Sequence, residues 1–260
     1  MRRHLALLLF LLLTGCQALE NQLVFHPWPA RESAAPLPEP LEDVTLHTRD
    51  GVKIQARWCP HPRSDGVILY CHGNAGNLEQ RGKLMRDFWL NLERSVLIFD
   101  YPGYGRSEGN PSEAGCYASA EAAYDWLQRE KGYPPERIII AGESLGGGVA
   151  VDLASKHPAQ QLVLIRTFTS VPDVAKQSLS SAPSIMVNRF DSLMKIPSVR
   201  VPVFIAQADR DRVMPFAHAE QLRDACMSPV RLHRLEGLGH NDPLPPAFFD
   251  ELRTFIERAH

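Results

Sequence analysis

The strongest constraint on the fold is an alternation, beyond residue 66, of short apolar runs with amphipathic stretches of ten residues or so. Runs of this kind are typical of buried parallel strands, and the stretches between them are typical of crossover helices. The expected strands are 67–71, 96–99, 138–141, 162–165, 203–206 and 230–235, and the expected helices are 77–91, 112–130, 145–156, 216–224 and 247–258. The pattern predicts an α/β protein with a mainly parallel sheet and helices on both of its faces.

Two further segments complete the expected domain. Asp50-Gly51 separates two alternating runs, 44–48 and 52–58, and predicts an antiparallel hairpin before the parallel strands. Residues 170–199 are expected to form a small helical cap. Their apolar side chains either line an acyl-accepting cleft or pack helices together; they are Leu179, Ile185, Met186, Val187 and Leu193.

The N-terminus is organised separately from the domain. Arg2 and Arg3 precede a Leu-rich run at 5–13, the layout of a secretory signal and too short to span a membrane. Leu13-Thr14-Gly15-Cys16 resembles a bacterial lipobox, which implies a signal peptide of residues 1–15 and an acylated Cys16. An ordinary cleaved signal and an uncleaved anchor are the alternatives.

The segment after Cys16 is expected to carry the domain on a tether. Residues 27–40 are rich in Pro, Ala and Glu and predict an extended stalk, so 16–40 is expected to be lipidated cysteine plus stalk and 41–260 the folded domain. The lipobox places the chain in the cell envelope, on the periplasmic side of a bacterial membrane. Because Gln17 is not the Asp associated with inner-membrane retention, the outer membrane is favoured in a Gram-negative source.

Charge and cysteine spacing exclude several classes of function. A net charge of −2 supplies no basic surface for nucleic acid. The cysteines other than Cys16 show neither C-x-x-C nor metal-ligand spacing, so no metal site is expected, and no disulfide is predicted. The cysteines concerned are Cys59, Cys71, Cys116 and Cys226.

A G-x-S-x-G motif carries the chemistry. Residues 142–146 read Gly-Glu-Ser-Leu-Gly and stand between an expected strand and an expected helix, the context that a nucleophile elbow at Ser144 requires. A serine hydroxyl needs a base, and His240 lies in a glycine-flanked loop late in the chain, where the order Ser, acid, His places it. The carboxylate that orients this imidazole is Asp209 or Asp211, both at the end of the preceding strand.

These motifs resemble the α/β-hydrolase superfamily, in its branch with His-Gly-Asn-Ala-Gly-Asn, here residues 72–77. Residues 100–107, 168–173 and 189–192 also match the branch, except that Pro102 stands where Arg is common. The resemblance covers residues 41–258. It implies Asp211 as the acid, the backbone N–H groups of Asn74 and Leu145 as oxyanion donors, and no cofactor.

The resemblance implies a hydrolase of carboxylic esters or thioesters that works through an acyl-enzyme. Its expected partner is a small or acyl-bearing substrate. A serine aminopeptidase-like peptidase and a non-catalytic envelope scaffold are the alternatives. A phosphate-binding loop at 71–77 is disfavoured because neither G-x-x-x-x-G-K-[ST] nor G-x-G-x-x-G occurs there.

Overall fold

The computed structural model describes residues 20–30, 40–176 and 186–258. The sheet has eight strands in the order β1-β2-β4-β3-β5-β6-β7-β8. The strands are β1 (Glu42–His47), β2 (Lys53–Cys59), β3 (Val67–Cys71), β4 (Ser95–Phe99), β5 (Ile138–Glu143), β6 (Gln161–Ile165), β7 (Val203–Ala208) and β8 (Val230–Leu235). The β1–β2 and β2–β4 pairs are antiparallel and all others are parallel, which confirms the predicted hairpin and fold class.

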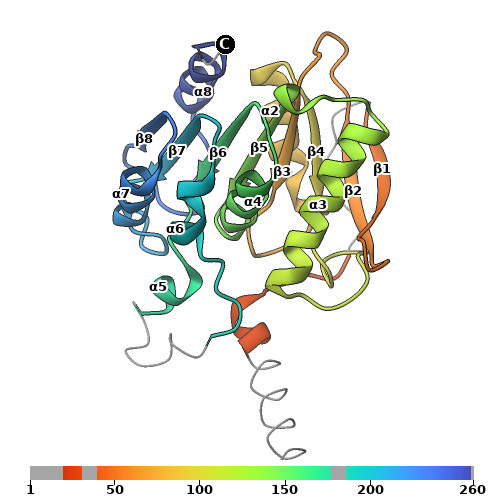
Figure 1. The fold of residues 1–260 in the computed structure, drawn as a ribbon, viewed down its shortest axis with the longest axis horizontal. Coiled ribbons are helices and arrows are strands. Elements are labelled where there is room, and N and C mark those ends of the chain that lie inside the picture. The colour runs from red at the N-terminus through yellow and green to blue at the C-terminus, as the bar shows by residue number, and fades with distance from the viewer. Residues whose placement is uncertain (1–19, 31–39, 177–185, 259–260) are drawn as a thin grey trace, which may run out of the picture.

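Helices cover both faces of the sheet (Figure 1). They are α2 (Gly82–Leu92), α3 (Glu113–Arg129), α4 (Leu145–Lys156), α5 (Val171–Ala175), α6 (Ser192–Lys195), α7 (Phe216–Ala225) and α8 (Pro246–Arg258), with 3-10 turns at Leu78–Arg81, Pro135–Arg137 and Ile196–Ser198. The range 77–91, expected as one helix, is a 3-10 turn that begins with a capping box between Asn77 and Gln80, followed by α2.

The period of two along each strand builds two hydrophobic layers. In β3, Leu69 packs into the core beneath α3, α4 and α7, whereas Ile68 and Tyr70 pack beneath α2 and α8. The parallel strands β3 and β5 are buried at every position except the last residue of β5, Glu143. Polar side chains that serve a site must therefore follow the strand ends.

The predicted cap is only partly a cap. Helix α5 follows β6 at the carboxyl edge of the sheet, but α6 packs beside α4, where Lys195 Nζ lies 2.7 Å from Asp152 Oδ1. Ile196 and Val199 are fully buried. This second part belongs to the core because its apolar side chains close the layer under α4. Met186 packs against the core and Val187 is exposed, while Leu179 and Ile185 lie outside the described residues.

Residues 20–30 lie against the domain, although 27–30 are the start of the predicted stalk. Val24 and Phe25 are buried, and Pro27 and Pro29 form bridges with Gly76 and Gly105. Docking occurs because these two apolar side chains precede the prolines and enter the core, which the composition of 27–40 does not reveal. The rest of the predicted stalk, 31–39, and the predicted signal with Cys16 lie outside the described residues.

No helix among the described residues is long and apolar enough to cross a membrane. Cys59, Cys71, Cys116 and Cys226 are free thiols. Burial raises the pKa of the Cys59 thiol to about 11 and that of Cys71 further, so both are protonated at neutral pH.

Candidate active site

Ser144 occupies the predicted elbow between β5 and α4. Its backbone is in the positive-φ region, at φ 53° and ψ −119°, which is uncommon for a residue other than glycine. A Cβ on Gly146 would lie 2.0 Å from the Cys71 carbonyl oxygen, and one on Gly142 would lie 2.2 Å from the Gly146 carbonyl oxygen. The chain passes so closely that only glycine fits at these two positions, as a nucleophile elbow requires.

His240 and Asp211 come together with Ser144 in one hydrogen-bonded chain. His240 Nε2 lies 3.1 Å from Ser144 Oγ, and His240 Nδ1 lies 2.7 Å from Asp211 Oδ2. The carboxylate fixes the tautomer in which Nδ1 carries the proton and Nε2 accepts from the serine hydroxyl. Three residues separated by 96 and 29 positions thus meet at the carboxyl edge of the sheet.

The two candidate carboxylates have different partners. The Asp211 side chain is fully buried, and its Oδ1 accepts hydrogen bonds from the backbone N–H groups of Val213 (2.8 Å) and Met214 (2.7 Å). Asp209 is exposed, and its Oδ1 accepts from Gly237 N at 2.8 Å. The geometry places Asp211 at the imidazole and leaves Asp209 to fix the turn after β8.

The predicted oxyanion donors flank Ser144. Leu145 is the first residue of α4, so its N–H has no acceptor within the helix. On the other side runs the loop after β3, where a Cβ on Gly73 would lie 3.5 Å from Ser144 Cβ. Asn74 follows in that loop, which brings its backbone to the same edge of the sheet as the serine.

The Asn74 side chain is committed to holding this loop. Its Nδ2 donates to the Val24 carbonyl oxygen (2.6 Å), and its Oδ1 accepts from His26 N (3.0 Å) and from the Tyr104 hydroxyl (2.8 Å). Burial raises the pKa of Tyr104, so the phenol remains a donor. The side chain is thereby occupied, and only the backbone N–H of Asn74 is left to bind an oxyanion.

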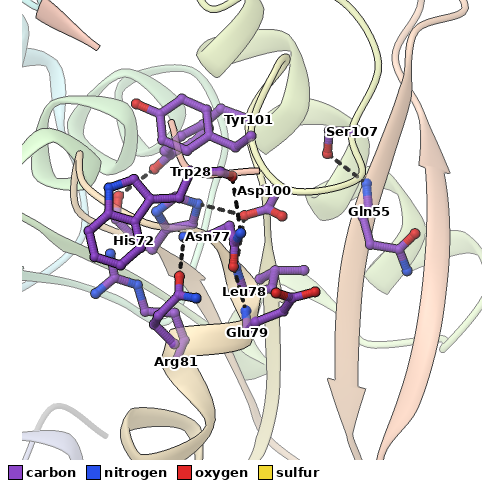
Figure 2. Close-up of polar contacts among 12 residues, drawn as sticks. Trp28, Gln55, His72, Asn77, Leu78, Glu79, Arg81, Asp100, Tyr101 and Ser107 are labelled. Carbon is purple, nitrogen blue, oxygen red and sulfur yellow. Dashed lines mark hydrogen bonds and ion pairs between the residues drawn. The ribbon is translucent and has the colours of Figure 1, made fainter. Parts of the chain in front are cut away.

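The His-Gly-Asn motif and the Asp-Tyr-Pro-Gly-Tyr-Gly motif support each other (Figure 2). The His72 ring is fully buried, with Nε2 3.2 Å from Asp100 Oδ1 but not aligned for a hydrogen bond. Asp100 Oδ1 accepts from Leu78 N (3.0 Å), and the Tyr101 hydroxyl donates to the His72 carbonyl oxygen (2.8 Å). These contacts hold the two loops together.

Arg166 is a site residue that the sequence did not reveal. It follows β6 with φ 48°, is 4% exposed, and donates from Nη2 to Glu143 Oε1 at 2.9 Å. Its Nη1 donates to the carbonyl oxygens of Asp242 (2.5 Å) and Gly239 (3.4 Å), on either side of His240. Arg166 therefore ties the elbow to the histidine loop. The available signal was a charged residue at the end of a buried strand.

Tyr70 completes this network from β3. Its hydroxyl donates to Glu143 Oε2 at 3.0 Å, and burial, followed by the Glu143 charge, raises its pKa well above the ordinary value. Both oxygens of the Glu143 carboxylate thus have partners. The residue before the nucleophile is held from two strands.

The two predicted motifs after β6 pair with each other. Val171 N donates to the Arg189 carbonyl oxygen (2.7 Å), and Leu193 N donates to that of Thr169 (2.9 Å). Burial alone would raise the pKa of Asp173, but hydrogen bonds from Lys176, Ser170 and Thr169 lower it to about 2. The carboxylate is therefore ionised at neutral pH and stabilises the first turn of α5.

The described residues bear on the predicted absence of a metal and on the predicted acyl-accepting cleft. No group of three or more His, Cys, Asp or Glu side chains in the described ranges is placed to hold a metal ion. A cavity of about 340 Å³ lies between β1 and α3, bordered by residues such as Leu46 and Trp126 and by none of the Ser144 site residues. The acyl-accepting cleft stays a prediction, since 177–185 in the predicted cap lie outside the described residues.

A serine elbow between strand and helix on a mainly parallel sheet defines a hydrolase of the α/β class. A sequence model described as alpha/beta hydrolase fold matches residues 66–191. An uncharacterized protein of Mycobacterium tuberculosis is 36% identical over 234 residues, which cover 86% of this chain and 81% of that protein. The chain belongs to the α/β-hydrolase family.

Other similarities extend across kingdoms and to solved structures. Alpha/beta hydrolase domain-containing protein 17B of Xenopus laevis is 32% identical over 220 residues, covering 83% of this chain and 75% of that protein. The structure of the Pyrococcus furiosus esterase Pf2001 has a TM-score of 0.74 and 19% identity, and covers 90% of this chain and 98% of that one. At this identity the structural match demonstrates the fold alone.

Proposed function

We propose that the chain is a serine hydrolase that cleaves a carboxylic ester or thioester. The single observation that carries the proposal is the chain of contacts from Ser144 Oγ through His240 to Asp211, at 3.1 and 2.7 Å. A serine hydroxyl next to a neutral imidazole that a buried carboxylate orients is the arrangement that activates it as a nucleophile.

In the proposed mechanism, His240 Nε2 takes the Ser144 proton as the serine oxygen attacks the acyl carbon. The N–H groups of Asn74 and Leu145 bind the oxyanion of the tetrahedral intermediate. His240 then gives the proton to the departing alkoxide or thiolate. Water, deprotonated by His240, attacks the acyl-enzyme and releases the acid and Ser144. Water is the only co-reactant, and the products are the carboxylic acid and an alcohol or thiol.

An ester or thioester is favoured over a peptide with a free N-terminus. A site for an α-ammonium group needs a cluster of carboxylates, whereas Asp209 and Asp242, close in sequence to Asp211 and His240, each hold a turn of the His240 loop. Asp209 accepts from Gly237 N, and Asp242 Oδ2 accepts from Gly239 N at 2.7 Å. The fold is also that of the Pyrococcus furiosus esterase, which supports a hydrolase.

The test of this function combines labelling with a substrate series. The wild-type chain should react with a fluorophosphonate probe and turn over p-nitrophenyl esters with a preference for one chain length. Ser144→Ala should lose labelling and nearly all turnover, on the order of 10⁶, while its melting temperature stays near that of the wild type. Hydrolysis of aminoacyl anilides in preference to esters would establish the peptidase instead, and an unlabelled, inactive wild type would establish a scaffold.

We further propose that Cys16 is acylated and anchors the chain in the cell envelope, with the outer membrane favoured in a Gram-negative source. Two or more acyl chains, at about 0.8 kcal/mol per buried CH₂, give a stable anchor where one chain is marginal. In a bacterial host with labelled palmitate, the wild type should incorporate label and Cys16→Ser should remain unlabelled precursor. An unlabelled wild type cut elsewhere would mean an ordinary secretory signal.

A further inference from the structure

Residues 20–30, named the strap below, run across the loops of the proposed active site. Trp28 N donates to the Gly76 carbonyl oxygen (3.4 Å) in the loop after β3, and Gly105 N donates to the Trp28 carbonyl oxygen (3.1 Å) in the loop after β4. The Asn77 side chain also donates to Trp28, at 3.1 Å (Figure 2). Both loops leave the carboxyl ends of their strands, so the strap lies on the edge of the sheet that holds Ser144.

The strap is fixed at its other end too. The Glu20 carboxylate accepts from Val187 N and from the backbone and side chain of Asn188, at 2.6 to 3.0 Å. The Phe25 ring packs edge-on against Phe190, with centroids 6.1 Å apart. Burying one such aromatic side chain contributes roughly 1.5–3 kcal/mol. The strap is thus part of the domain, and Figure 1 shows it at the same end of the sheet as α5.

This docking limits how far the site lies from residue 16. Glu20 is four positions after Cys16, and four extended residues span at most about 14 Å. An acyl group on Cys16 therefore holds the carboxyl edge of the sheet close to the lipid. A free stalk would have left this distance open, whereas the docked strap keeps this edge of the sheet within it.

Exposed apolar side chains gather at the same edge. Leu23 (68% exposed) and Trp28 (49%) lie on the strap, Val187 (57%) lies beside Glu20, and Val213 (47%) is two residues beyond Asp211. The other large apolar side chains exposed in the described ranges, Leu90, Met194 and Met227, lie on α2, on α6 and before β8. Trp at the rim of an apolar surface is typical of membrane interfaces.

We propose that this edge is a lipid-binding surface, on which Leu23 and Trp28 enter the interface of the bilayer and the mouth of the Ser144 site faces it. The proposal rests on the proposed acylation of Cys16. It implies that the acyl group of the substrate is taken from the membrane surface and does not arrive from the aqueous side.

The test uses the acylated full chain bound to phosphatidylcholine vesicles whose acyl chains carry bromine, which quenches tryptophan emission on contact. The chain has four tryptophans, and quenching relative to unbrominated vesicles should be largely lost in Trp28→Phe. Trp126→Phe, near the end of α3, is the matched control and should keep the quenching. The surface exposure of Trp28 means that its replacement should leave the melting temperature unchanged.

Equal quenching in wild type and Trp28→Phe would overturn the proposal, and so would a wild type that is bound to vesicles but unquenched. If the wild-type protein carries no acyl chains and does not bind vesicles, both the proposed lipid-binding surface and the proposed anchor are wrong. Turnover of a soluble p-nitrophenyl ester by the same preparation reports on the proposed hydrolase separately, because that substrate needs no membrane.

Discussion

The elbow and the oxyanion loop hold opposite sides of Ser144 by different means. The shape of the elbow is set by local backbone, by glycines that leave no room for a Cβ and a helix that begins one residue after the nucleophile, with Tyr70 and Arg166 supporting Glu143 beside it. The oxyanion loop is fixed by side chains from afar, since Asn74 is bound to Val24 and His26, about 50 residues earlier in the chain. The first side is built into the strand–helix connection, and the second depends on the strap staying docked.

This difference predicts how each side fails. A substitution among the groups at the elbow should lower activity strongly, because each of these groups works in one position only. Removing one of the several hydrogen bonds that hold the oxyanion loop should lower activity less, because the remaining bonds still keep the loop near its place.

Asp211→Asn should lower kcat by roughly 10⁴, because an amide favours the wrong tautomer of His240. Asp209→Asn is the matched control and should stay within a few-fold of the wild type, since the Asp209 carboxylate accepts from Gly237 N and it is Asp211 that contacts the imidazole. Ester turnover of both purified variants provides the comparison. The reverse ranking would make Asp209 the acid that orients His240.

Sequence patterns named residues on both sides of Ser144, but not the strap that holds the oxyanion loop. Ser144, Asp211 and His240 each follow a strand that an apolar run marks, so their meeting at one edge follows from the topology of parallel strands. The strap could not be predicted in this way, because its contacts join residues about 50 positions apart and the prolines after Phe25 are typical of an extended tether. The role of Arg166 was not predicted either, because its partners lie on two segments far from it in the sequence, the end of β5 and the His240 loop.

Arg166→Met should lower the free energy of unfolding by about 3–5 kcal/mol, because it leaves the Glu143 carboxylate without its cation in a mostly buried position. Urea unfolding measures the change. Arg166→Met combined with Glu143→Gln should recover part of the loss, because the amide that replaces the carboxylate is neutral and can still accept from Tyr70. If the double variant is no more stable than Arg166→Met alone, the ion pair between Arg166 and Glu143 does not stabilise the elbow.

Asn74→Ala should lower kcat by about 10–10², with KM nearly unchanged, because the backbone donor remains but loses its fixed position. Removing an oxyanion donor outright costs about 10²–10³, which sets the upper limit. His26→Ala is the comparison variant and should cost less than Asn74→Ala, since the His26 backbone N–H keeps its bond to Asn74 Oδ1 and only the 3.2 Å contact between His26 Nδ1 and Asn74 Nδ2 is lost. A rise in KM at constant kcat would mean that Asn74 contacts the substrate and does not position the loop.

The smallest expected effect belongs to Tyr104→Phe, which removes one hydrogen bond of 2.8 Å to Asn74 Oδ1 and leaves the bond from His26 N in place. One neutral hydrogen bond contributes about 0.5–1.5 kcal/mol, so kcat should fall by about 2–10-fold. The informative measurement is the double variant with Asn74→Ala. If Tyr104 acts through Asn74, its replacement should have no further effect on kcat once the amide is gone. A full 2–10-fold loss in the Asn74→Ala background would instead mean that the phenol acts on His72, whose ring centroid lies 5.6 Å from its own. The oxyanion loop would then be held from the core as firmly as the elbow, and the contrast between the two sides of Ser144 would not stand.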